Sequence, residues 1–181
     1  MRNHIVSFMI VSFMLLSFVI SGCAGWDPNR AREEDLLVQA TIAKFKKADS
    51  SMQTYFDNAY GYAVFPTVGK GGYIIGGGHG KGWVYAQNAL IGHASITQIT
   101  VGAQIGGQSY SEIIFFKDAA ALEIFKTGNL ALAAQATAVI VTEGASKDRS
   151  YNDGVAVFTL PKAGAMAEAT IGGQKFEFYP K

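Results

Sequence analysis

The chain has 181 residues, with 15 lysines and arginines against 14 aspartates and glutamates, so its formal net charge is +1 at pH 7. This balance argues against a nucleic-acid-binding protein, because such proteins carry a strongly basic domain or stripe. With 4 prolines and 49% hydrophobic residues the chain also lacks the composition of a disordered protein, and it is long enough for one domain with its own core.

The N-terminal 22 residues have the layout of a secretory signal. Arg2 is followed by an apolar run over residues 5–20 and then by small residues. The run is short for a helix that must cross a ~30 Å hydrocarbon core, and a polar, turn-prone segment follows it. Residues 1–22 are therefore predicted to direct export. The alternative is a retained transmembrane anchor.

The segment Ile20-Ser21-Gly22-Cys23 resembles the lipobox of bacterial lipoproteins. The resemblance implies that Cys23 becomes the first residue of the mature protein and carries diacylglycerol and a fatty acid such as palmitate. Cys23 is the only cysteine, so no internal disulfide can form and acylation accounts for the thiol. More than one acyl chain is needed for stable anchoring. Ala24 follows, which in similar Gram-negative lipoproteins favours the outer membrane, facing the periplasm.

A tether over residues 23–30 and a domain over residues 31–181 are expected next. Asp27-Pro28 is typical of a helix start, with Asp as the N-cap and Pro at the first helical position. Apolar residues at helical spacing then predict one helix over residues 28–58, with a possible break at residues 49–51. The residues of its buried face are Val38, Ile42, Phe45, Met52, Phe56 and Ala59.

After residue 60 the pattern predicts short strands and tight turns. Of the 21 glycines, 13 lie between Gly61 and Gly107, interleaved with aromatic and β-branched residues. A hairpin is expected over residues 71–86, turning at residues 79–80, and a short helix over residues 118–126. Pro66 is expected to end a strand at residues 62–66, and Pro161 a strand at residues 155–159. A final hairpin is expected across Gly172-Gly173, with strands at residues 167–171 and 175–179. The other expected strands are at residues 95–106, 110–116 and 137–142. Residues 130–142 fit a helix or a strand, with strand favoured from Thr137.

The predicted fold class is α+β: a mostly antiparallel curved sheet with a long N-terminal helix and one short internal helix. Three segments of this pattern resemble the SYLF domain family. They are AYGYAVFPTVGKGGYIIGGGHGKGWVY at residues 59–85, IGGQSYSEIIFF at residues 105–116 and KAGAMAEATIGG at residues 162–173. Together the resemblance covers roughly residues 35–180.

The resemblance to the SYLF family implies phospholipid binding, with phosphoinositides favoured in eukaryotic members. It also implies an amphipathic N-terminal segment, and actin binding in some fungal members. An exported bacterial protein is not expected to meet actin or phosphoinositides. The implied partner here is therefore the phospholipid of the cell envelope.

The glycine-rich segment supplies candidate head-group ligands. Lys70 with Gly71 and Gly72, and Gly80 with Lys81, could present backbone N–H groups and positive charge to an anionic group. The segment is not a P-loop, because no Ser or Thr follows Lys81. The alternative is that these glycines only permit sharp turns and close strand packing.

A second basic cluster consists of Lys44, Lys46 and Lys47. Near an anionic membrane surface each charge would contribute ~1 kcal/mol, whereas a solvated helix face is the ordinary alternative. His79 and His93 lack Cys or carboxylates at ligand spacing, so no metal site is predicted.

No catalytic site or cofactor is expected. The chain has neither a Gly-x-Ser-x-Gly segment nor an HExxH segment, and its acidic residues are scattered. Four of them are expected at the surface and not in an acid/base pair: Glu112, Asp118, Glu143 and Asp153. The predicted function is that of an envelope-anchored lipoprotein, not an enzyme, whose SYLF-like domain binds phospholipid head groups, anionic lipids favoured. The alternative is a non-catalytic structural or interaction component that binds another envelope protein.

Overall fold

A computed structural model describes residues 28–130, 132–133, 138–147 and 149–181. The predicted signal, Cys23 and the tether up to residue 27 lie outside the described residues. Residues Met1–Glu33 and Glu34–Lys181 form two separate units, and the sheet belongs entirely to the second. No helix of the described part is both long and apolar enough to span a bilayer.

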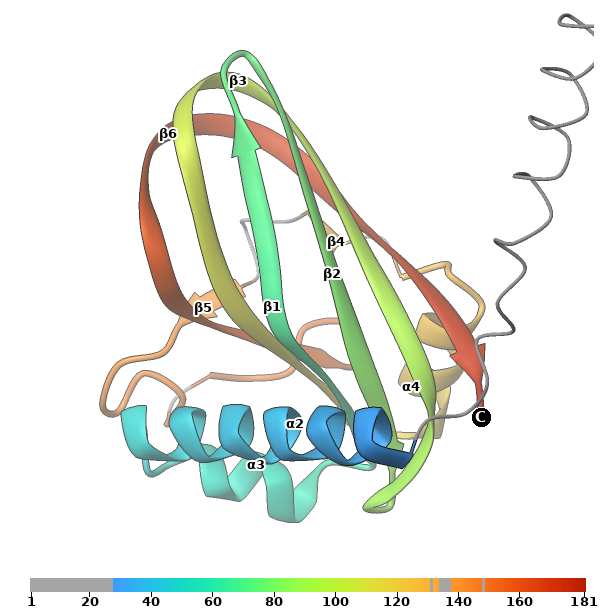
Figure 1. Cartoon of the computed structure of the whole chain (residues 1–181). Helices are drawn as coiled ribbons and strands as arrows, with labels where there is room; N and C mark the ends of the chain where they lie inside the picture. Colours follow the sequence, from blue (N-terminus) through green and yellow to red (C-terminus); the bar gives the residue numbers. More distant parts are fainter. Residues whose placement is uncertain (1–27, 131, 134–137, 148) are drawn as a thin grey trace, which may run out of the picture. The chain divides into compact units, whose positions relative to one another are not determined.

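A hairpin and two arched strands build the sheet (Figure 1). Strands β1 (Gly61–Gly72) and β2 (Ile75–Ala86) pair as the hairpin. Strand β3 (Ala89–Phe116) arches over it, so that its first half pairs with β2 and its second half with β1. Strand β6 (Val155–Pro180) follows the other edge of β3 through both halves. All of these pairings are antiparallel.

Two short strands complete the sheet on the outer edge of β6. Strand β4 (Leu132–Ala133) pairs antiparallel with Gln174 and Gly173, and β5 (Ala138–Ile140) pairs in parallel with residues 157–159. The sheet is therefore mixed but mostly antiparallel, and together with the helices it confirms the α+β class.

Two glycines permit the arch of β3. Gly102 and Gly106 have φ angles of 139° and 115°, which an L side chain rarely adopts. They flank the point at which β3 passes from β2 to β1, where Gly72 pairs with Gly106. The sharp curvature of the sheet thus begins in the sequence of β3.

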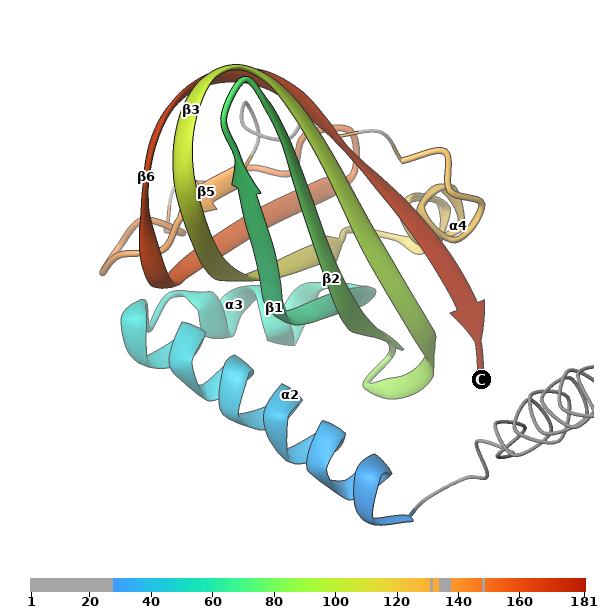
Figure 2. The same ribbon diagram turned by 45° about the horizontal axis from the view of Figure 1, so that its top comes forward.

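Alternation along the strands gives the sheet two apolar faces. The inner face packs Phe65 and Phe176 against Phe125 of helix α4 (Ala119–Lys126), with the Phe125 and Phe176 ring centroids 5.3 Å apart. The outer face packs against helices α2 (Pro28–Ala48) and α3 (Met52–Asn58), through residues such as Val38 and Tyr55. Figure 2 shows α2 and α3 lying together, apart from α4. In the part of the chain that the structure describes, every core residue of both faces follows Glu34, so residues 24–181 contain all of them.

The predicted hairpin turn at residues 79–80 is wrong. The turn lies at Tyr73-Ile74, and His79 and Gly80 sit in the middle of β2, paired with Thr97 and Ile96. Glycines that resemble a turn in the sequence serve close packing instead. A Cβ at Gly80 would lie 2.9 Å from the Val68 side chain and 3.0 Å from that of Ile96.

Other predicted boundaries change for related reasons. Residues 167–179 are no hairpin, because β6 runs unbroken past Gly172 and Gly173 along its partner β3. Pro66 and Pro161 do not end their strands, because each lies where the strand register shifts and no ladder hydrogen bond is required of it. The expected helix over residues 118–126 is confirmed as α4, with Asp118 Oδ1 accepting from the N–H of Ala121 at 2.9 Å.

One long helix over residues 28–58 is not confirmed, since the chain divides into α2 and α3 around a buried carboxylate. Asp49 Oδ1 accepts from the N–H of Ser51 at 2.9 Å and from its hydroxyl at 2.6 Å. Asp49 Oδ2 accepts from the N–H and the hydroxyl of Ser146, both at 2.7 Å. Burial alone would raise the pKa of Asp49, but these hydrogen bonds outweigh it and hold the pKa well below its usual range.

Asp49→Asn in residues 24–181 is expected to lower the free energy of unfolding by ~2–4 kcal/mol, because charge-assisted hydrogen bonds are lost and an amide NH₂ faces donors. Since the folded-state pKa is depressed, the stabilisation is present above the unfolded pKa of ~3.9 and is lost as the pH falls below it. Urea unfolding followed by far-UV circular dichroism between pH 3 and pH 7 measures both effects.

Asp57→Asn is the matched control for this substitution. Asp57 is exposed and accepts one hydrogen bond, from Gln53 Nε2 at 2.7 Å. Its substitution should change stability by less than ~0.5 kcal/mol, as is usual at the surface. Equal effects at positions 49 and 57 would show that the buried carboxylate does not hold the junction of the two helices to Ser146.

Candidate functional site

Large apolar side chains are exposed where the sheet bends. Among the described residues, six of the eleven exposed large hydrophobic side chains lie here, each 56–69% exposed. They are Tyr73, Ile74 and Ile75 of the hairpin turn and Ile99, Val101 and Ile105 of β3, and we call this set the apolar bend. Ile75 pairs with Val101, and the N–H of Gly102 donates to the carbonyl of Ile74 at 2.9 Å. The turn and the arch are thus fastened into one surface.

Rows of side chains continue from the apolar bend along the outer face of β2, β3 and β6. Cross-strand pairing places residues of the three strands side by side. The rows, in order from the bend, are His79–Thr97–Lys175, Lys81–Ser95–Glu177 and Trp83–His93–Tyr179. Successive rows are two residues apart, or ~7 Å. The face therefore changes from apolar to basic and then to aromatic.

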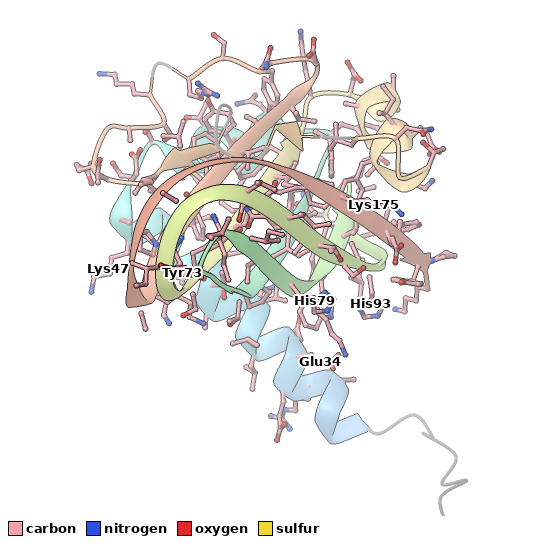
Figure 3. The ribbon with its side chains drawn as sticks, turned by 90° about the horizontal axis from the view of Figure 1, so that it is seen from above. Glu34, Lys47, Tyr73, His79, His93 and Lys175 are labelled. Atoms are coloured by element: carbon pink, nitrogen blue, oxygen red, sulfur yellow. The ribbon has the colours of Figure 1, made fainter. Side chains whose placement is uncertain are left out.

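The outer face has a hollow of about 590 Å³ over these rows. Its lining includes Lys81, Trp83, His93 and Tyr179 from the sheet and Glu34 from α2. Glu34 lies one turn before the fully buried Val38, so both residues are on the helix side that faces the sheet. Figure 3 shows Glu34 on α2 near His79 and His93. The Trp83 and His93 rings meet edge to face, with centroids 5.9 Å apart.

The structure separates the two lysines of the predicted head-group site. Lys70 is only 6% exposed and lies on the inner face, opposite Gly78, whereas Lys81 is exposed on the outer face, opposite Thr67. Because paired residues share a face and neighbours along a strand alternate, these lysines cannot contact one ligand on one side of the sheet.

The other predicted ligands are also dispersed. Gly71 is exposed beside the apolar bend and Gly72 is next to it, but Gly80 is buried. Lys44 and Lys47 are exposed on α2, and Lys46 Nζ lies 4.5 Å from the centroid of the Phe56 ring. The lysine cluster is thus a helix face and not part of the sheet surface.

A layer of polar side chains lies inside the arch, and sequence reasoning missed it. The Tyr110 hydroxyl donates to Gln98 Oε1 at 2.9 Å, and Gln174 Nε2 donates to Glu112 Oε2 at 3.0 Å. Glu112 was expected at the surface but is fully buried, and no described residue hydrogen-bonds its Oε1. Burial raises the pKa of Glu112 to about 7, against a smaller opposing effect of the Gln174 hydrogen bond. Glu112 lies two residues before the inward-facing Ile114, and residues two apart in a strand point to the same face, so this spacing was the signal for its burial.

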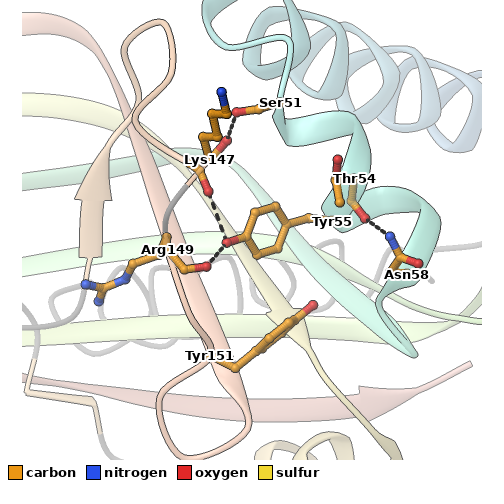
Figure 4. A pocket seen from close by; sticks show the side chains of 8 residues that line it. Ser51, Thr54, Tyr55, Asn58, Lys147, Arg149 and Tyr151 are labelled. Carbon is orange, nitrogen blue, oxygen red and sulfur yellow. Dashed lines mark hydrogen bonds between the residues drawn. The ribbon is translucent and has the colours of Figure 1, made fainter.

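A smaller hollow of about 270 Å³ lies beside α3 (Figure 4). The Tyr55 hydroxyl points at the carbonyls of Ser146, at 3.2 Å, and of Arg149. Asn58 Nδ2 donates to the carbonyl of Thr54 at 2.8 Å. These polar groups are engaged with the chain itself, so the hollow marks the packing of α3 on residues 146–147 and 149–151. No group of three or more potential metal ligands occurs in the described ranges.

Comparison with known proteins gives one distant relative. No family model matches the chain. The chain is 30% identical over 158 residues to the protein named Beta cell expansion factor A of Aeromonas veronii. The match covers 83% of this chain and 59% of that protein, so the chain spans less than two thirds of its relative's length. The resemblance to the SYLF family therefore rests on the three sequence segments alone.

Glu112→Gln is expected to remove a pH dependence of stability. Because the folded-state pKa is raised to about 7, the folded protein holds a proton that the unfolded chain releases above pH ~4.5, and stability falls as the pH rises between these values. The loss should be ~2–3 kcal/mol at most by pH 8. Urea unfolding at pH 5, 6, 7 and 8 measures it.

The control for position 112 is Glu123→Gln. Glu123 is exposed and pairs with Lys126 at 2.6 Å, so its substitution should leave the fall in stability between pH 5 and pH 7 in place. A wild-type protein whose stability is constant over this range would contradict a buried, protonated Glu112.

Proposed function

We propose that the protein is a lipid-anchored lipoprotein of the bacterial envelope whose folded domain binds phospholipid membranes, anionic lipids favoured. The observation that carries this proposal is the apolar bend, in which six exposed apolar side chains lie together at the hairpin turn and in the arch of β3. Single exposed apolar residues are normal, but a contiguous group marks an interaction site. The export signal and the lipobox-like segment at Cys23 support the membrane as the partner.

The energetics of the apolar bend favour insertion into the interfacial region of a bilayer. Full burial of an isoleucine or valine side chain contributes ~1.5–3 kcal/mol, so three such residues contribute roughly 4.5–9 kcal/mol, which corresponds to binding between the millimolar and micromolar ranges without a deep pocket. Interfacial elements enter the head-group boundary by ~5–10 Å. The row of His79 and Lys175 lies ~7 Å from Ile99, within reach of lipid phosphates at that depth.

Charge supplies the preference for anionic lipids in this proposal. Lys81 and Lys175 are exposed on the outer face next to the bend, and each would contribute ~1 kcal/mol near an anionic surface. Of the predicted head-group ligands, Lys81 therefore retains its role and the buried Lys70 does not. The similarity to SYLF segments agrees with a lipid-binding role, and the residue after Cys23 favours the outer membrane, facing the periplasm.

The second candidate is a non-catalytic interaction with another envelope protein. Leu36 and Leu37 are 61% and 46% exposed on α2, whereas the next residue, Val38, is fully buried. A stoichiometric protein recovered with the native lipoprotein from detergent-solubilised envelopes, and lost on Leu36→Ser with Leu37→Ser, would favour this candidate. It requires in addition that vesicle binding is absent.

Ile74→Ser with Ile99→Ser is expected to weaken membrane binding at least tenfold, because two side chains no longer contribute apolar burial. Residues 24–181, without the acyl group, are co-sedimented with phosphatidylglycerol vesicles and with phosphatidylcholine vesicles at low and high salt. Wild-type protein should favour phosphatidylglycerol and lose that preference at high salt.

Ile140→Ser is the matched control for the bend. Ile140 of β5 is 61% exposed, as is Ile99, but it lies outside the apolar bend. Its substitution should leave co-sedimentation unchanged. Equal recovery of wild-type protein with both lipids, or an equal loss at positions 140 and 99, would reject the proposed membrane contact.

A further inference from the structure

We infer that the hollow over the outer face of β2, β3 and β6 is a binding site for a phosphate ester that carries a primary ammonium group, as in phosphoethanolamine. This inference goes beyond membrane association through the apolar bend, since it assigns a distinct small-molecule site and a ligand class. At about 590 Å³ the hollow lies within the ~300–1,000 Å³ range of ligand sites.

Two opposite charges face the hollow without a partner. The Glu34 carboxylate and the Lys81 ammonium both line it, and neither forms an ion pair or a hydrogen bond with a described residue. They also do not reach each other, because their charged atoms are more than 4.0 Å apart. A ligand that carries one negative and one positive group would neutralise both at once.

The charge of the lining argues against a simple anion. Glu34 and Glu177 supply two carboxylates and Lys81 supplies one ammonium group, and Glu177 is paired with Lys175 at 3.5 Å. Phosphate alone would neutralise Lys81 and leave the Glu34 carboxylate without a counter-charge among the described residues. The ligand must therefore bring a cation as well.

The order of the rows provides a place for each ligand group. Lys81 and Ser95 lie in one row and can donate to phosphate oxygens, next to the row of His79 and Thr97. The adjacent row, ~7 Å away, contains Trp83, which lines the hollow and whose aromatic ring can attract a cation. The link between the phosphate and the amine of phosphoethanolamine is only two carbons long, so one ligand can span neighbouring rows.

A primary amine suits the Glu34 carboxylate better than a quaternary ammonium group does. The oxygens of Glu34 accept hydrogen bonds that an –NH₃⁺ group donates and a trimethylammonium group cannot. Glu177 is already engaged by Lys175 at 3.5 Å and by the hydroxyl of Tyr179, which donates at 3.0 Å. Phosphocholine is thus expected to bind more weakly than phosphoethanolamine.

The test is a titration of residues 24–181 with free phosphoethanolamine. Trp83 lines the hollow, so Trp26→Phe leaves it as the only tryptophan and its fluorescence reports occupancy. A saturable change is expected, with at least tenfold weaker binding of phosphocholine, inorganic phosphate and ethanolamine. Equal affinity for phosphate alone or for ethanolamine alone would overturn the inference, as would no fluorescence change.

Variants separate this site from the fold and from the membrane contact. Glu34→Gln and Lys81→Gln should each weaken phosphoethanolamine binding at least tenfold, whereas the controls Glu33→Gln and Lys44→Gln, both exposed on α2, should not. Unchanged far-UV circular dichroism shows that each variant folds. Ile74→Ser with Ile99→Ser should bind phosphoethanolamine normally, so failure of the membrane proposal and failure of this one have different signatures.

A vesicle experiment distinguishes the source of the ligand. If the lipid head group is the ligand, Glu34→Gln reduces co-sedimentation with phosphatidylethanolamine vesicles but not with phosphatidylcholine vesicles. If the free ester is the ligand, Glu34→Gln lowers affinity in the titration and leaves both vesicle types unaffected. An effect of Glu34→Gln in neither assay would reject the site.

Discussion

Strand β3 is hydrogen-bonded to both strands of the hairpin that it encloses, and this pairing shapes the rest of the domain. A strand that pairs with β2 and then with β1 must turn back on itself, and the positive φ angles of Gly102 and Gly106 allow it to do so. The arch places the hairpin turn against its own crest, where Gly102 holds Ile74. It also aligns three strands on one side, so that residues far apart in the chain form rows.

The curved sheet separates two apolar layers, and two carboxyl groups are nevertheless buried in the domain. Asp49 and Glu112 are both buried carboxyl groups, but their surroundings drive their pKa values in opposite directions. Four hydrogen bonds from Ser51 and Ser146 favour the charged form of Asp49, whereas the single bond from Gln174 cannot compensate for the burial of Glu112. The number of donors that reach each carboxylate decides the outcome.

Sequence reasoning succeeds here where a local period determines the result. Alternation along the strands predicted a mostly antiparallel α+β fold, and the helix expected over residues 118–126 is α4. It failed at glycines, because their role in β2 depends on partner side chains such as Val68 and Ile96 that are distant in the chain. For the same reason Lys70 and Lys81 could not be assigned to opposite faces from the sequence alone. The hollow is lined by Glu34 together with β2, β3 and β6, which begin at Ile75, Ala89 and Val155, and no short motif records contacts over such separations.

The pairing of β3 with β6 bears on the time at which the domain can fold. Its ladder joins Phe116 to Val155 and Gly92 to Pro180, so most of it closes long loops, and such pairings form slowly. Until the C-terminal strand emerges, β3 lacks its neighbour along both halves and the inner core lacks Phe176. The sheet therefore closes only when β6 is in place, so completion of the fold depends on contacts between segments far apart in the chain.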